Sequence, residues 1–133
     1  ILNNLYDGEE ILLGELINNN SFSIINIWAS WCLPCREEHA YLLKLKNISK
    51  INIVGINYRD KKSNALKFLS DLKNPYSKVL IDKDGTKSIE LGAIGIPETY
   101  LVNKNKVILK KYIGPLDNLK FREIIELIKN ETN

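Results

Sequence analysis

Two cysteines separated by two residues are the part of this sequence best suited to chemistry. Cys32 and Cys35 are the only thiols among 133 residues, with Leu33 and Pro34 between them. Such a pair can be a structural bridge, half of a metal site, or a dithiol that is oxidised and reduced in turn. A bridge this short closes a tiny loop and removes little entropy from the unfolded chain, so a purely stapling role is disfavoured.

The residues on either side of the pair predict a junction between a strand and a helix. Residues 21–29 form a nearly continuous apolar run, as expected of a central strand covered on both faces. Residues 33–47 predict a helix, because Pro34 suits its first turn and Glu37 and Glu38 suit its positive end. The dithiol therefore stands where a helix begins.

This position assigns different roles to the two thiols. A helix N-terminus presents unpaired N–H groups and a partial positive charge, which stabilise the thiolate of a cysteine there. We expect Cys32 to be the exposed nucleophile that attacks a substrate disulfide. Cys35, one helical turn on, is close enough to resolve the mixed disulfide that results.

The metal interpretations are weaker. A zinc site needs four ligands, whereas the sequence offers the two thiols and the single histidine, His39. Cu(I) can be held by two thiolates and stays open as an alternative. Arg36 follows Cys35, so the haem-attachment pattern C-x-x-C-H is absent. We expect no metal and no cofactor, and a packed or partly exposed His39.

The rest of the chain predicts an α/β fold with a mixed sheet, parallel first and antiparallel at the end, and helices on both faces. Asp7-Gly8 suggests a hairpin, residues 18–20 a loop, and Ser63 a helix N-cap. The further expected elements are a strand at 51–58, a helix at 63–72, a strand at 78–82, a helical turn at 86–93, a hairpin of 99–103 with 106–113, and a helix at 118–129.

Composition sets further limits. A hydrophobic content of 44% over 133 residues fits one domain, 1–133. The net charge of +3 is scattered over the sequence, and the lysines at 104, 106, 110 and 111 read as protection of an edge hairpin, so no nucleic-acid partner is expected. No apolar run approaches the roughly 20 residues that span a bilayer. The chain does not start with Met, and we expect a signal or anchor upstream of it.

Five stretches give a resemblance to a known family: "NIWASWC", "CREEH", "GINYRD", "NPYSKVLIDKDG" and "GIPETY". The chain resembles thioredoxin-fold proteins, and more narrowly the thiol–disulfide proteins of cytochrome c maturation known as CcmG or DsbE. The resemblance implies a monomer in the periplasm, tethered to the inner membrane. It also implies a reductant of apocytochrome c or of a maturation partner, kept reduced by a membrane thiol electron donor.

The resemblance adds residues to the site. It implies that Cys32 and Cys35 are the redox pair. It also implies a cis Ile96-Pro97 bond packed against the dithiol, with the Ile96 backbone offering hydrogen bonds to a substrate segment. Trp31 is expected in the apolar docking surface. Tyr58 and Arg59 are further groove candidates, and Trp28 is expected in the core.

Two positions differ from thioredoxins or from this family. Thioredoxins keep an acid where this chain has Asn26, and we expect Glu98, beside the proline, to supply a proton relay instead. Ala40 stands where the family usually has proline, which leaves the usual helix kink in doubt. The direction of the redox reaction is open between a specific reductant and a general oxidant or exchanger. A Cu(I) chaperone and a redox-inert interaction domain are the other readings.

Overall fold

The structure is a computed structural model that describes residues 1–17, 21–48 and 51–132. The strands are β1 (Leu2–Asn4), β2 (Glu10–Ile11), β3 (Phe22–Trp28), β4 (Ile51–Tyr58), β5 (Lys78–Asp82), β6 (Glu98–Val102) and β7 (Ile108–Ile113). The helices are the 3₁₀ turn η1 (Leu13–Leu16) and the α-helices α1 (Leu33–Lys46), α2 (Lys62–Leu72), α3 (Thr86–Leu91) and α4 (Asn118–Thr132).

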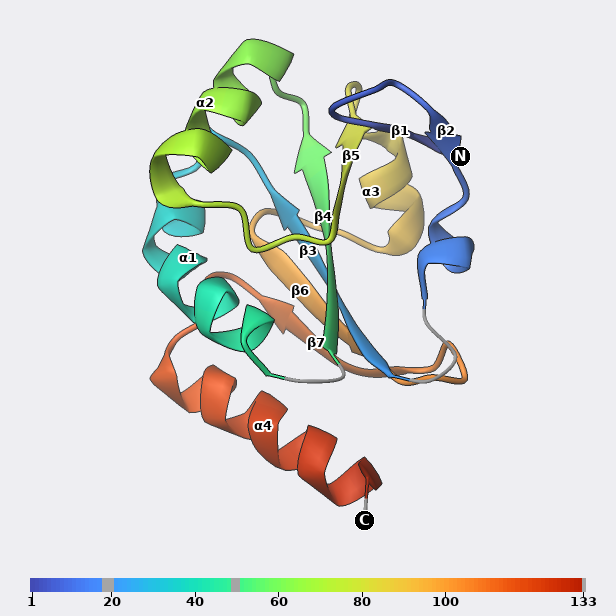
Figure 1. The fold of residues 1–133 in the computed structure, drawn as a ribbon, viewed down its shortest axis with the longest axis vertical. Helices are drawn as coiled ribbons and strands as arrows, with labels where there is room; N and C mark the ends of the chain where they lie inside the picture. Colours follow the sequence, from blue (N-terminus) through green and yellow to red (C-terminus); the bar gives the residue numbers. More distant parts are fainter. Residues whose placement is uncertain (18–20, 49–50, 133) are drawn as a thin grey trace.

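Within these residues the strands form one seven-stranded mixed sheet in the order β2-β1-β5-β4-β3-β6-β7 (Figure 1). β4 lies parallel to both β3 and β5, whereas β6 and β7 continue the sheet in antiparallel fashion. Every residue of β3 is buried, because helices cover both faces of the central strands. The predicted thioredoxin-like α/β architecture is confirmed.

The helices divide into two layers (Figure 1). α1, α2 and α4 pack on the face of the sheet that carries Ile24 and Trp28. α3 and η1 pack on the opposite face, which carries Ile25 and Ile27. Because successive residues of a strand point to opposite faces, neighbours in β3 and β6 belong to different layers.

Most predicted elements are present, with one difference at the start of α2. β1 and β2 pair antiparallel around the Asp7-Gly8 turn, as expected. α2 begins at Lys62, so Ser63 lies inside the helix and does not cap it. α1 is continuous through Ala40. The loop predicted at residues 18–20 lies outside the described residues.

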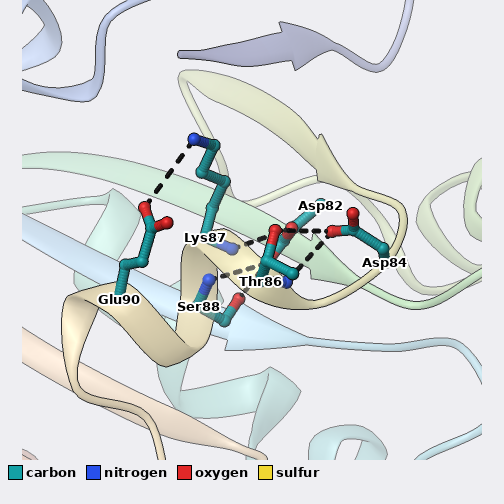
Figure 2. A network of polar contacts seen from close by, with 6 residues as sticks. All are labelled: Asp82, Asp84, Thr86, Lys87, Ser88 and Glu90. Carbon is teal, nitrogen blue, oxygen red and sulfur yellow. Dashed lines mark hydrogen bonds and ion pairs between the residues drawn. The ribbon is translucent and has the colours of Figure 1, made fainter.

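A polar network fixes the turn between β5 and α3 (Figure 2). The buried carboxylate of Asp82 accepts hydrogen bonds from the Ser88 N–H at 2.7 Å and the Ser88 hydroxyl at 2.6 Å. Asp84 accepts in the same way from the N–H and hydroxyl of Thr86. Gly85 has a φ of 81°, and a Cβ there would lie 2.6 Å from the Tyr58 ring. The start of α3 is thereby held against the end of β4.

Lysines lie along one edge of the sheet. β7 forms one edge of the sheet and carries Lys110 and Lys111, which pair with Glu123 at 3.6 Å and with Glu98 at 3.4 Å. In the three described ranges, the helices are all too short or too polar to cross a bilayer.

Candidate active site

Cys32 and Cys35 form a disulfide at the start of α1, with their Cα atoms 5.3 Å apart. Cys32 is the N-cap of the helix: its backbone is extended, and its Sγ accepts a hydrogen bond from the Cys35 N–H at 3.3 Å. The Cys32 N–H closes a tight turn by donating to the Ala29 carbonyl. A sulfur in this position faces the unpaired N–H groups and the partial positive charge of the helix end.

We expected the Cys32 thiolate of the reduced pair to be exposed, whereas the structure describes the disulfide form. In the disulfide form Cys32 is only 5% exposed and Cys35 only 2%. The reason is that the Cys32 sulfur turns toward Cys35 and the helix end. The neighbouring side chains are the exposed ones, with Trp31 at 59% and Leu33 at 66%.

The segment before β6 faces the same region. The Ile96-Pro97 peptide bond is cis, as the resemblance implied. Pro97 is buried, and Ile96 packs against the core cluster that contains both cysteines. Ile96 and Trp31 also line one open hollow of about 430 Å³. The complete lining is Trp31, Tyr58, Ile89, Ala93, Ile94, Gly95 and Ile96. The structure thus brings these two predicted groove residues together.

Glu98, the predicted proton relay, is not among the residues that line this hollow. Its carboxylate accepts hydrogen bonds from the N–H groups of Ile94 and Gly95 and from the Tyr100 hydroxyl, at 2.7, 3.0 and 2.8 Å. Burial opposes ionisation of Glu98, but these bonds and the Lys111 ammonium outweigh it and lower the pKa of the carboxyl. Thr99 faces the side of the sheet that carries the Asn26 side chain. Because side chains alternate along a strand, Glu98 and Tyr100 face the opposite side. The relay role of Glu98 stays a prediction, and its contacts favour anchoring of the loop before Pro97.

A second carboxyl, Glu38, lies on the face of the sheet that carries the dithiol. It is fully buried in α1, three residues after Cys35, a spacing that places two side chains on one side of a helix. Glu38 accepts hydrogen bonds from the Asn26 amide at 2.9 Å and from the Leu116 N–H at 3.1 Å. Burial raises its pKa to about 7, although both bonds act in the opposite direction.

From the sequence, Glu38 was expected only to suit the positive end of the helix, and its burial was not predicted. The available signal was its spacing from Cys35. Asn26, which replaces the acid of thioredoxins, connects Glu38 to the sheet: its amide group also donates to Thr99, and its oxygen accepts from the Tyr76 hydroxyl at 2.7 Å. Burial, followed by the nearby Glu38 charge, raises the pKa of Tyr76 well above its usual value.

His39 is a packed residue, as expected. Its Nε2 donates to the Lys73 carbonyl at 2.7 Å, and its ring meets the edge of Phe68. Burial lowers the pKa of His39 below the usual value for histidine. The hydrogen bonds between its ring and the backbone of Lys73 and Leu72, at the end of α2, act in the opposite direction. Among the residues that the structure describes, no three His, Cys, Asp or Glu side chains are grouped to hold a metal ion.

A thioredoxin-like sheet, a helix-capping Cys-x-x-Cys disulfide and a cis-proline loop beside it define the class of thioredoxin-fold thiol–disulfide oxidoreductases. Residues 4–127 match the family model described as Redoxin. The chain belongs to this family.

Curated relatives support the narrower resemblance. The chain is 48% identical over 101 residues to the thiol:disulfide interchange protein CycY of Rhizobium leguminosarum bv. viciae, covering 76% of this chain and 54% of that protein. It is 40% identical over 103 residues to the thiol:disulfide interchange protein DsbE of Escherichia coli strain K12, covering 77% and 55%. The chain therefore spans about half the length of these relatives. The resemblance to the DsbE group is confirmed.

Solved structures support the fold. StoA from Bacillus subtilis superposes with a TM-score of 0.72 at 24% identity, covering 94% of this chain and 95% of that one. A DsbF homologue from Corynebacterium diphtheriae gives a TM-score of 0.80 at 23% identity, covering 96% and 83%.

Proposed function

We propose that this chain is the catalytic domain of a reductant that opens disulfides in apocytochrome c or in a partner of cytochrome c maturation. The observation that carries the proposal is the dithiol itself: Cys32 caps α1, Cys35 stands behind it, and the cis-proline loop lies alongside. The names of the DsbE and CycY relatives support thiol–disulfide interchange as the reaction.

The exchange proceeds in two steps that balance in atoms and electrons. The Cys32 thiolate attacks one sulfur of the substrate disulfide, which forms a mixed disulfide and releases the first substrate thiolate. Cys35 then loses its proton and attacks the Cys32 sulfur. This releases the second substrate thiol and leaves the Cys32–Cys35 disulfide. Two electrons pass to the substrate, and a membrane thiol donor is proposed to restore the dithiol.

Glu38 favours the reducing direction over the oxidising one. A pair becomes a strong oxidant when its reduced, thiolate form is stabilised. The Glu38 carboxylate lies one helical turn after Cys35. Its negative charge disfavours the negatively charged thiolate form of Cys35. With a pKa of about 7, Glu38 can also accept the Cys35 proton during resolution.

The substrate segment is proposed to bind beside the dithiol, against Trp31, Ile96 and Pro97. Trp31, Ile89 and Ile94 are large apolar side chains with more than half of their surface exposed, and they line the same hollow. Such a surface suits an apolar segment next to the reacting cysteine, and we propose that the backbone of Ile96 pairs with this segment in strand fashion. The location proposed from the resemblance is the periplasm, with a tether to the inner membrane and a monomeric state.

The test is substrate trapping in cells with Cys35→Ala. This variant can form the mixed disulfide through Cys32 but cannot resolve it, so the captured partner identifies the substrate. The double variant Cys32→Ala, Cys35→Ala is the control and should capture nothing. Capture of an apocytochrome or a maturation protein is expected. A measured potential well above about −180 mV would instead indicate an oxidant. Tight stoichiometric Cu(I) binding without any exchange would contradict the proposal.

A further inference from the structure

Outside the residues used above, one carboxylate, that of Asp60, joins the turn that carries the nucleophile to the turn after β4. Asp60 follows β4 and is half-buried. Its Oδ2 accepts from the Ser30 N–H at 2.7 Å and from the Asn57 amide at 3.1 Å. Its Oδ1 accepts from the Ser30 hydroxyl at 2.8 Å and from the Lys61 N–H at 2.8 Å. A single side chain thus joins the β3–α1 turn to the β4–α2 turn.

Ser30 donates two of these four bonds and stands two residues before Cys32. Its backbone and its side chain are both held, so the peptide unit cannot rotate without breaking both bonds. On its other side, the Arg36 guanidinium donates to the Ser30 carbonyl at 3.4 Å. Trp31, the next residue, donates from its indole nitrogen to the Arg59 carbonyl at 3.0 Å. The turn is therefore held from several directions.

Arg59, which accepts the hydrogen bond from Trp31, is itself held in place. Arg59 has a φ of 45°, in the left-handed region that residues other than glycine rarely adopt. Its N–H donates to the Asp82 carbonyl on β5 at 3.0 Å. Asp82 in turn binds the start of α3 through its side chain (Figure 2). Asp60 therefore connects the nucleophile's turn to a fixed region at the carboxyl ends of β4 and β5.

We propose that Asp60 is a positioning residue for thiol–disulfide exchange, which holds Ser30 and Trp31 so that the Cys32 sulfur stays at the N-terminus of α1 when the disulfide opens. The physical reason is that Cys32 loses its covalent partner in the reduced state, so that its position then depends on the backbone of its turn and on the hydrogen bond from the Cys35 N–H. Misplacement of a reacting atom by about 1 Å can cost a large factor in rate. The inference does not depend on which partner the dithiol reduces.

The test compares Asp60→Asn and Ser30→Ala in the reduced protein. The measurements are the rate with a small neutral disulfide, 2-hydroxyethyl disulfide, and the pH midpoint of Cys32 alkylation. Asp60→Asn should slow exchange about tenfold even at a pH where Cys32 is fully ionised. Ser30→Ala keeps the carboxylate charge, so its expected upward shift of the midpoint reports position alone. The double variant Ser30→Ala, Asp60→Asn should be no slower than Asp60→Asn alone. The reason is that both changes disrupt the same contact, the one between Ser30 and Asp60.

Asp71→Asn and Ser63→Ala are the matched controls. Both residues lie on the exposed side of α2, and Asp71 pairs only with Lys67 in the described structure. Neither control should change the rate or the midpoint. A purely structural role of Asp60 would lower the melting temperature and leave both readouts unchanged, and this result would overturn the proposal. If Asp60→Asn does not fold, an unchanged midpoint in Ser30→Ala overturns it equally.

Discussion

The Glu38 carboxylate accepts a hydrogen bond of 2.9 Å from the Asn26 side-chain amide, which joins α1 to the central strand β3 on the face of the dithiol. This contact places an ionisable group where thioredoxins are expected to keep an acid in the strand. Here the acid comes from the helix, and the strand supplies its donor. The pair makes the stability of the protein depend on pH.

Glu38 should cost stability as the pH rises. Its pKa is about 7 in the folded protein and about 4.5 when unfolded, so the folded state binds more protons between these values. The free energy of unfolding should therefore fall from pH 4.5 to 7, by at most about 3 kcal/mol, and stay level above. Urea unfolding across this range measures the slope. Glu38→Gln should remove this part of the slope, whereas the exposed control Glu37→Gln should retain it.

Glu98→Gln separates anchoring of the loop from proton relay. The Glu98 carboxylate binds the N–H groups of Ile94 and Gly95 and pairs with Lys111. Its loss should destabilise the protein by about 1–3 kcal/mol, because glutamine keeps one acceptor oxygen for three donors and cannot pair with the Lys111 ammonium. The Cys35 thiol titration should change less than in Glu38→Gln. A shift as large as in Glu38→Gln would show that Glu98 does relay the proton.

Gly55 cannot carry a side chain. A Cβ at this position in β4 would lie 2.9 Å from the Trp28 indole nitrogen and 2.9 Å from the Tyr76 ring. Gly55→Ala should therefore cost about 1–3 kcal/mol by overpacking, measured as a lower midpoint in chemical unfolding. Gly14→Ala is the control, because a Cβ there meets nothing closer than 4.0 Å. Equal effects of the two changes would contradict this account of the core.

Trp31 should matter for large substrates more than for small ones. Its ring is 59% exposed and lines the hollow beside the cis-proline loop. Trp31→Ala should lower kcat/KM about tenfold for an unfolded protein disulfide, a size typical of an exposed aromatic anchor. Trp31→Phe, which keeps an aromatic ring but loses the bond to Arg59, should retain most of the activity. Equal losses in both variants would assign the effect to that bond instead.

Local pattern predicted much of the fold, and the contacts it could not predict are between distant residues. The apolar run at β3, the helix after Cys32 and the hairpin around Asp7-Gly8 follow from neighbouring residues. The cis bond at Pro97 came from family resemblance. The burial of Glu38 depends on Leu116, 78 residues away, so no nearby pattern reports it. The low exposure of Cys32 in the disulfide likewise depends on where its sulfur turns, which its sequence neighbours do not show.

The edge strand β7 affects how copies of this domain meet one another. Its outer backbone groups could pair with a second strand, but Lys110 and Lys111 lie along it, and the pairing with β6 shifts at Leu101/Val102. Charge and irregular register make a poor template for sheet growth. Pairing between two copies of this domain through β7 is therefore disfavoured.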